Sequence, residues 1–409
     1  MTNKMNRRKF LKTIGAYGTG ILAGSKSIGL LAPRSAKADE PLRILQCSEF
    51  SGPYATTGMY SSRGVKVAID RVGGKVLGRP IELIDRDAPN PGEAVRKAQE
   101  GVEKLGVKFI MTSPSSATAL AVMEYAAKQG VFMIAGGGSD QITGSACNKY
   151  TFRRTTPAWG AVREVVPRII KEYKANTFYT ITAKYVFGED LLQNTKAVLE
   201  EQGKKLLDNS YHPIGESDFS SHLTKAMAAK ADCVLFLNFS SDTVNSIKQA
   251  VNFGLGKVSR IACAWGEGIT VFRAIGAKAL EGTIWGLQYW HTLDTPKNIE
   301  FVKAFKDKYG EVPPYSSEES YAPALNFLEC IEKAKSADPL KVVAAMENYE
   351  YDGVTGREKW RACDHQCIKK VFTVRCKEPQ AMKSPDDFVD IVGSSVNYLP
   401  CEKTGCKMS

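Results

Sequence analysis

The sequence predicts an α/β protein built from two successive units, each a parallel sheet covered by helices. Three observations support this fold class. Short apolar runs alternate with helical patterns between residues 42 and 135, and the alternation begins again after residue 157. Two of the apolar runs end in turns rich in glycine and hydroxyl side chains. Regular strand–helix alternation is typical of parallel sheets, which bind ligands beyond the carboxyl ends of their strands.

The chain begins with a segment typical of an export signal. Arg7 and Arg8 precede a weakly apolar stretch over residues 13–32, and the segment ends in the small-x-small pattern Ala36-Lys37-Ala38. Paired arginines in this position indicate the twin-arginine (Tat) route. We therefore expect a Tat signal peptide over residues 1–38, cleaved after Ala38, and a periplasmic protein. The alternative is a basic surface helix.

The basic charge of the chain lies partly in this segment. Residues 1–38 hold eight Lys and Arg and no acid, so removing them lowers the formal net charge from +11 to +3. No basic stripe remains that would indicate a nucleic-acid partner. About 370 residues are left, which is enough for two domains with sizeable cores.

All ten cysteines follow the predicted signal. An even number in an exported chain favours disulfides, so we expect most of them to be paired, with the C-terminal ones attaching the tail to the second unit. His365 between Cys363 and Cys367 raises the alternative of a metal site. The Cys-x-x-Cys spacing of zinc sites is absent, however, and we expect neither a metal nor a cofactor.

In the first unit, strand-length apolar runs and helical patterns alternate without interruption. We expect strands at 42–46, 80–87, 108–111 and 131–135, and helices at 64–72, 94–105 and 117–129. The first strand is followed by SGPYATTG (51–58), which has the composition of a turn.

The second unit repeats this order after YTFRRTTP (150–157), and the last third of the chain is mixed. We expect helices at 159–173, 191–202, 219–228 and 242–253, and strands at 178–182, 205–211, 233–239 and 260–265. Further helices are expected at 298–309, 320–335 and from 340 to 346, with a strand at 370–375. The tail after Pro379 has weak periodicity and is expected to be extended and cross-linked.

The turns after the third and fourth strands form a candidate anion-binding corner. They read SPSSAT (113–118) and GGGS (136–139). Glycines let a ligand approach the backbone closely, and Ser116 and Ser139 add hydroxyl groups. We expect this corner to hold a carboxylate, the alternative being two ordinary strand-to-helix turns.

These motifs, in this order, resemble those of the type I periplasmic solute-binding proteins of ABC importers, specifically the branched-chain amino acid (Leu/Ile/Val-binding) group. The resemblance covers most of residues 42–375 and also includes VFGED (186–190) and ESDFSSHL (216–223). It implies two Rossmann-like lobes with parallel sheets, 39–157 plus 289–372 and 158–288 plus 373–409. It also implies a three-segment hinge, with crossings near 157–159, 288–290 and 372–375, and a ligand that binds between the lobes and closes them.

The resemblance also implies roles for particular residues. Ser116, with Gly137 and Ser139, matches the group that binds a ligand carboxylate. Phe187 and Phe239 match aromatic ligand contacts, and Glu267 matches the acid that pairs with an α-ammonium. The family's first-turn aromatic residue is replaced by Thr57, with Tyr54 nearby, and the usual disulfide is missing because Ala88 and Ser115 stand in its place. Tyr54, Phe187, Phe239 and Trp265 follow strand runs closely enough to wall an apolar pocket.

The function implied is passive capture of a small carboxylate by a monomer that delivers it to the membrane permease of an ABC importer. A hydrophobic or branched-chain amino acid is the first choice of ligand; an aromatic carboxylate or a small amide is the alternative. An enzyme is not expected, because Gly-x-Ser-x-Gly, His-Glu-x-x-His and P-loop motifs are absent. A sensory role, as a soluble ligand-binding partner of a chemoreceptor, is the remaining alternative.

Overall fold

The structure, a computed structural model, describes residues 40–408. The predicted signal peptide and its cleavage site lie outside these residues. Within the described part of the chain, no helix has both the length and the apolar character that crossing a membrane requires.

The first sheet has six strands in the order β2-β3-β1-β4-β5-β6. All neighbours pair in parallel except the short hairpin of β2 and β3. Its strands are β1 (Leu42–Ser48), β2 (Lys75–Val76), β3 (Arg79–Asp87), β4 (Phe109–Ser113), β5 (Phe132–Ala135) and β6 (Thr151–Arg153). The helices of this part are α1 (Ala55–Arg71), α2 (Pro91–Leu105) and α3 (Ser116–Lys128).

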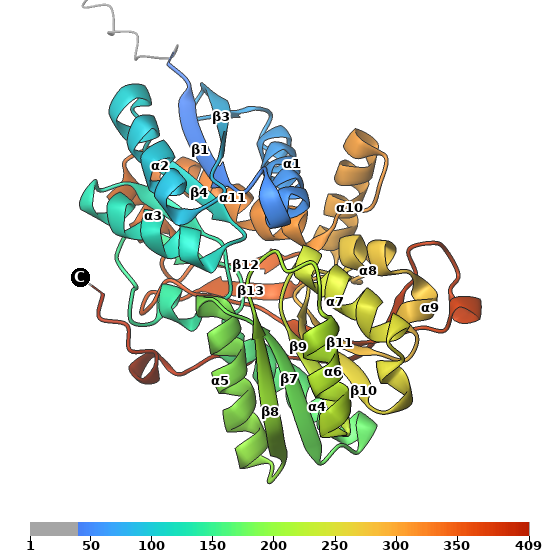
Figure 1. Ribbon diagram of the computed structural model, residues 1–409. Coiled ribbons are helices and arrows are strands. Elements are labelled where there is room, and N and C mark those ends of the chain that lie inside the picture. The colour runs from blue at the N-terminus through green and yellow to red at the C-terminus, as the bar shows by residue number, and fades with distance from the viewer. Residues whose placement is uncertain (1–39, 409) are drawn as a thin grey trace, which may run out of the picture. The chain divides into compact units, whose positions relative to one another are not determined.

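The chain returns to this sheet late in the sequence, with α10 (Pro296–Tyr309), α11 (Tyr315–Ala334) and α12 (Pro339–Met346). Helices α1 and α11 pack so closely that a Cβ on Gly64 would lie 2.0 Å from the carbonyl oxygen of Ser317. Only glycine allows this approach. The orange α10 and α11 therefore lie beside the blue α1 in Figure 1, although more than 200 residues separate them.

The second sheet has seven strands in the order β16-β15-β11-β10-β9-β7-β8. Five are parallel: β7 (Thr177–Ala183), β8 (Lys205–His212), β9 (Cys233–Leu237), β10 (Arg260–Gly266) and β11 (Ile284–Leu287). β15 (Val371–Cys376) pairs antiparallel with β11, and the edge strand β16 (Val389–Ser395) pairs antiparallel with β15. The helices of this part are α4 (Ala158–Tyr173), α5 (Val186–Glu201), α6 (Ser220–Ala229), α7 (Ser241–Asn252), α8 (Ile269–Ile275) and α9 (Ala277–Leu280). A small third sheet holds β12 (Glu350–Gly353), β13 (Gly356–Trp360) and β14 (Cys367–Ile368).

We call the parts around the first and second sheets the first and second lobes. The two-lobed α/β fold class with parallel sheets is confirmed. The third crossing was placed too late, because 372–375 lie inside β15, where Phe372 pairs with Leu287 of the second sheet. The chain crosses just before β15, at Lys369, whose ammonium donates to the Gln288 carbonyl of the second crossing at 2.8 Å.

A fully buried group of charges ties the hinge to the first lobe. Arg154 lies in the first crossing, directly after β6, and its guanidinium pairs with Glu318 of α11 at 2.6 Å and Glu358 of β13 at 2.8 Å. The side chains of all three residues are fully buried. Buried charges of this kind persist only when paired. We call Arg154, Glu318, Glu358 and Lys369 the hinge ion cluster.

The expectation that most cysteines are paired is wrong. Two disulfides form, Cys147–Cys406 and Cys363–Cys401. The six others are free and buried: Cys47, Cys233, Cys263, Cys330, Cys367 and Cys376. They lie on strands and in α11, where a thiol acts as a small apolar side chain, so the even count carried no information about pairing.

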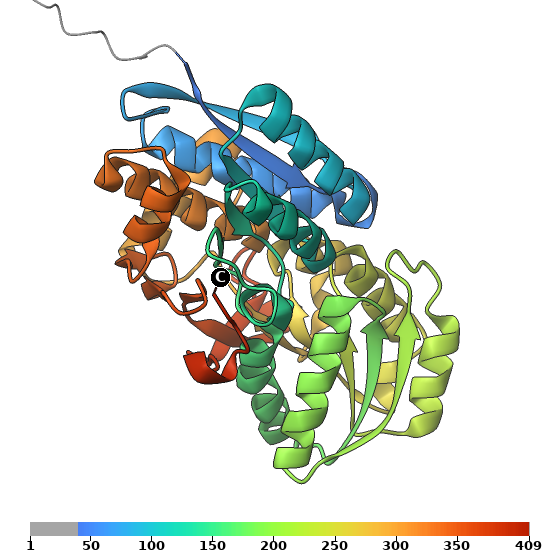
Figure 2. The same cartoon turned by 90° about the vertical axis from the view of Figure 1, so that its left-hand side faces the viewer.

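The C-terminal tail was also expected to be attached to the second lobe, and this too is wrong. After β16 the chain leaves the second sheet as a segment that we call the C-terminal strap, residues 396–406. The Tyr398 hydroxyl lies 3.1 Å from Thr156 Oγ1 and accepts from the Lys369 amide at 3.2 Å, both in hinge crossings. The strap then ends at Cys147, in the first lobe. Figure 2 shows the C-terminus beside the teal loops of that lobe.

Candidate functional site

A cavity lies where the carboxyl ends of the strands of both sheets meet. It is narrow: about 20 Å³ is open to the centre of a water-sized sphere, within about 310 Å³ of space between atoms that includes open solvent. Its walls come from the ends of β1, β4, β5 and β6 in the first sheet and of β7, β9 and β10 in the second, together with the start of α11. This is the position in which open α/β sheets bind ligands.

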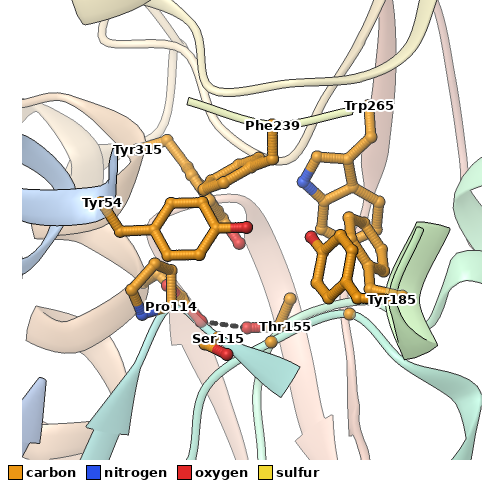
Figure 3. A pocket seen from close by; sticks show the side chains of 12 residues that line it. Tyr54, Pro114, Ser115, Thr155, Tyr185, Phe239, Trp265 and Tyr315 are labelled. Carbon is orange, nitrogen blue, oxygen red and sulfur yellow. Dashed lines mark hydrogen bonds between the residues drawn. The ribbon is translucent and has the colours of Figure 1, made fainter. Parts of the chain in front are cut away.

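Aromatic residues make up half of this wall (Figure 3). They are Tyr54, Tyr185, Phe187, Phe239, Trp265 and Tyr315. Phe187 and Trp265 meet edge to face with ring centroids 4.9 Å apart, and Tyr54 and Phe239 lie 6.0 Å apart across the two lobes. The predicted pocket residues Tyr54, Phe187 and Phe239 are thus brought together, along with Trp265.

The polar part of the wall is small. It consists of Ser115, Thr155, Glu319 and the backbone at Gly137 and Gly138. Gly137 has φ of 90°, and a Cβ there would lie 2.6 Å from Ser116 Oγ, so the backbone at this point depends on glycine. Thr155 donates a hydrogen bond to Oε1 of Glu319, drawn as the dashed line in Figure 3. The cavity wall contains no Lys, Arg or His among the described residues.

Of the three residues assigned to carboxylate binding, Ser116, Gly137 and Ser139, only Gly137 lines the cavity; Pro114, Ser115 and Gly138 of the same two turns line it as well. The Ser116 hydroxyl accepts from the Ser139 amide at 3.1 Å. The Ser139 hydroxyl donates to the Asp190 carboxylate of α5 at 2.5 Å and so bonds across the two lobes. Both serines are buried behind the wall, and the hydroxyl that faces the cavity is that of Ser115.

Thr57 and Glu267 also lie behind the wall rather than in it. The Thr57 hydroxyl of α1 donates to Glu267 Oε1 at 2.5 Å, across the two lobes, and Ser240 Oγ lies 3.3 Å from the same hydroxyl. Glu267 is 2% exposed. Burial raises its pKa to about 7, against the hydrogen bonds from Thr57 and Ser240, which lower it. The predicted ammonium partner therefore bridges the lobes directly.

This bridge predicts a pH-dependent effect of Glu267→Gln. The folded pKa of Glu267 is about 7 against an ordinary 4.5, so folding favours its protonated form, and that contribution to stability is lost as pH rises from 4.5 to 7. The neutral glutamine cannot ionise, so the variant does not lose stability in this way. Its free energy of unfolding, relative to that of the parent, is expected to rise by up to about 3 kcal/mol between pH 4.5 and pH 7. Urea unfolding of both proteins at several pH values measures the difference; a constant difference would contradict the prediction.

Sequence reasoning did not select six of the wall residues. They are Pro114, Ser115, Tyr185, Thr155, Tyr315 and Glu319. The first four lie inside or beside motifs that the resemblance used, at 113–118, 186–190 and 152–157, so the turns were found but not the side chains that face inward. Tyr315 and Glu319 stand at the start of α11, before the predicted helix at 320, and had no sequence signal.

The alternative of a metal site at His365 has no support in the described residues. Cys363 is bonded to Cys401, and the His365 ring stacks on Phe152 with centroids 3.8 Å apart. Its Nε2 lies 3.0 Å from the Glu347 carboxylate. Within residues 40–408 no group of three or more His, Cys, Asp or Glu is placed to hold a metal ion.

Comparison with known proteins places this architecture in a family. The family described as periplasmic binding protein matches residues 41–381. The "Leu/Ile/Val-binding protein homolog 7" of Brucella abortus is 28% identical over 338 residues, covering 78% of this chain and 84% of that protein. The "Leucine-, isoleucine-, valine-, threonine-, and alanine-binding protein" of Pseudomonas aeruginosa is 28% identical over 339 residues, covering 82% and 89%.

A solved structure agrees with these relatives. The amino acid ABC transporter substrate-binding protein of Pseudomonas fluorescens Pf-5 is similar to this chain with a TM-score of 0.86 and 37% identity, over 90% of this chain and 99% of that one. The family match spans well over half of the sequence, and the two-lobed fold with its interlobe cavity is the architecture that the sequence motifs implied. The chain belongs to the periplasmic binding protein family and, within it, to the type I solute-binding proteins of the branched-chain amino acid group.

Proposed function

We propose that the protein is the periplasmic substrate-binding component of an ABC importer, which captures a small carboxylate ligand, most simply a hydrophobic or branched-chain amino acid, by closure of the two lobes. The observation that carries the proposal is the aromatic cavity between the lobes, with wall residues from both. A ligand held there contacts both lobes at once, so its binding energy favours the closed arrangement. The names of the P. aeruginosa and P. fluorescens relatives agree with an amino acid.

The proposal includes the accompanying assignments. The protein acts as a monomer without catalysis, delivers its ligand to a membrane permease, and reaches the periplasm by the Tat route with cleavage after Ala38. In this proposal Tyr54, Phe187 and Phe239 contact the ligand, and the backbone at Gly137 receives its carboxylate. Thr57, Ser139 and Glu267 hold the closed lobes together behind the wall through the bonds described above, and Ser116 supports Ser139 from within the first lobe.

An aromatic carboxylate or a small amide remains the second candidate. The observation in its favour is the set of six aromatic side chains around one cavity. Aromatic rings pack well edge to face and offset against one another, so a flat ring is a suitable occupant.

A thermal-shift screen followed by calorimetry tests the function. The panel contains leucine, isoleucine, valine, phenylalanine, benzoate and benzamide. A ligand that binds only the folded protein raises its stability by about 2.7 kcal/mol at a hundredfold excess over Kd. Stabilisation by at least one compound is expected. If none of the panel changes the unfolding temperature, the proposed capture of a small carboxylate or amide is contradicted.

Trp265→Ala is expected to weaken the binding of whichever compound the screen identifies by at least tenfold. The substitution removes a ring that lines the cavity and packs on Phe187, and a buried aromatic contact with a ligand is worth more than the ~1.4 kcal/mol that a factor of ten represents. Calorimetry measures the change. Phe253→Ala is the matched control, since that ring is 42% exposed and outside the cavity wall. Equal affinities of the two variants would contradict the assignment of the cavity.

A further inference from the structure

The cavity wall contains one ionisable group with an unsatisfied atom, the carboxyl of Glu319. Its side chain is 6% exposed, and its Oε1 accepts from the Thr155 hydroxyl. Its Oε2 has no hydrogen-bond partner anywhere in residues 40–408. A buried acceptor without a donor is costly, and such a group facing a cavity indicates a missing donor.

The cations behind the wall are already engaged. Arg154 is shared between Glu318 and Glu358, and the Lys369 ammonium donates to the Gln288 carbonyl. The cluster around Glu319 therefore holds three acids, Glu318, Glu319 and Glu358, against two bases. Glu319 is the acid without an ion-pair partner among the described residues, and it is the one that lines the cavity.

The surroundings of this carboxyl suit a cation. Tyr315 and Tyr54 line the same small cavity as Phe239 and Trp265, and aromatic faces attract cationic nitrogen. An anionic group placed against Glu319 would meet a like charge, and the wall offers no basic side chain to offset it. Because Oε2 lacks a donor, the matching cation must carry at least one N–H, which a quaternary ammonium does not.

We propose that Glu319 binds a protonated N–H-bearing amine of the ligand, so that the cavity is selective for amines, with or without a carboxylate at the Gly137 end. This inference rests on the proposed function and names the ligand class of the same site. It assigns the amine to Glu319 of α11 in the first lobe, whereas Glu267, the acid that the sequence motifs indicated, is bonded to Thr57.

The experiment compares ligand pairs that differ only in the amine. The probes are L-leucine against 4-methylpentanoate and L-phenylalanine against 3-phenylpropanoate, measured by calorimetry with the full mature chain. The amine-bearing member of a pair is expected to bind at least tenfold more tightly. Glu319→Gln is expected to lower its affinity at least a hundredfold and to leave the binding of the amine-free member within threefold.

Glu49→Gln is the matched control. Glu49 is also a buried carboxyl beside the cleft, bonded to Thr118 at 2.7 Å, and burial raises its pKa to about 7 as it does for Glu319. It does not line the cavity, so this variant is expected to bind both members of each pair like the parent.

Proton release provides a second readout on the parent protein, independent of how well a variant folds. The groups facing Glu319 are Glu318 on its own helix, Arg154 and Lys369 from two crossings, Tyr315, Thr155 and Glu267. Amine binding requires the ionised carboxylate, so calorimetry at pH 6 in buffers of different ionisation enthalpy should show proton release that largely disappears at pH 8.5.

The outcomes separate this inference from the function on which it rests. If the amine-free acids bind as tightly as their partners, if Glu319→Gln binds the amines like the parent, or if no proton is released at pH 6, the amine assignment is overturned and the binding function stands. If no binding is found for any of the four probes or for any compound of the screening panel, the proposed function is contradicted, and the amine assignment is contradicted with it.

Discussion

Replacing Arg154 by methionine is expected to lower the free energy of unfolding by about 3–5 kcal/mol, a large share of the stability of a typical domain. The guanidinium is fully buried and neutralises two fully buried carboxylates, those of Glu318 and Glu358. Methionine fills much of the volume but removes the ion-pair partner of both acids. Urea unfolding at pH 7 measures the loss. A loss below about 1 kcal/mol would show that the hinge ion cluster does not stabilise the fold in this way.

Two controls accompany this variant. Arg96→Met removes an exposed ion pair with Glu93, whose side chains are 58% and 39% exposed, and a change within about 0.5 kcal/mol is expected there. Combining Arg154→Met with Glu358→Gln also removes the charge of one of the two unpaired carboxylates. The double variant should therefore regain part of the lost free energy of unfolding.

The acid limb of the stability curve provides a further check on the same cluster. Burial alone would raise the pKa of Glu358, but the Arg154 guanidinium lowers it to about 2, below its ordinary 4.5. The stability that this pair contributes is therefore present above pH 4.5 and is lost as pH falls toward 2. In Arg154→Met the free energy of unfolding should therefore fall less between pH 4.5 and pH 2 than it does in the parent.

Removing the disulfide between Cys147 and Cys406, by serine at both positions, is expected to lower the free energy of unfolding by about 2–5 kcal/mol. The bonded residues are 259 positions apart, and a cross-link over such a distance strongly restricts the unfolded chain. Thermal unfolding under non-reducing conditions measures the effect.

Reductant and thiol counting provide the controls for this prediction. Reductant should destabilise the parent. It should not change the stability of a variant in which all four bonded cysteines are replaced, since the other six are free thiols. Under denaturing, non-reducing conditions the parent should show six reactive thiols. A count near zero would contradict the assignment of six free cysteines and restore the expectation that most of the cysteines are paired.

Much of the fold could be predicted from the sequence because buried parallel strands have a distinct local signature. The runs at 108–111 and 131–135 became β4 and β5, since a strand covered on both faces must be apolar throughout. Errors arose where a helix began inside a motif taken for a turn. SGPYATTG enters α1 at Ala55, and α5 begins at Val186 with VFGED as its first turn, five residues before the helix expected at 191–202. The edge strand β16 was missed because its residues are largely exposed and lack alternation.

The site could be predicted only as far as strand ends could be located. The aromatic residues Tyr54, Phe187 and Phe239 lie a few residues beyond the ends of β1, β7 and β9, so their convergence follows from topology. Whether Ser115 or Ser116 faces the cavity depends on the first turn of α3, which a single sequence does not specify. Glu319 reaches the cavity because α11 packs against α1, a contact between segments more than 200 residues apart. Such long-range packing leaves no local pattern.

The path of the C-terminal strap changes the covalent topology of the molecule. With Cys406 bonded to Cys147, the chain from residue 147 to residue 406 forms a closed covalent ring that includes the whole second sheet and all three crossings of the hinge. One cut of the backbone between these residues opens the ring without releasing a fragment. A protein nicked once in an exposed loop such as 213–218 should therefore keep its full mass under non-reducing denaturing electrophoresis and separate into two pieces only after reduction.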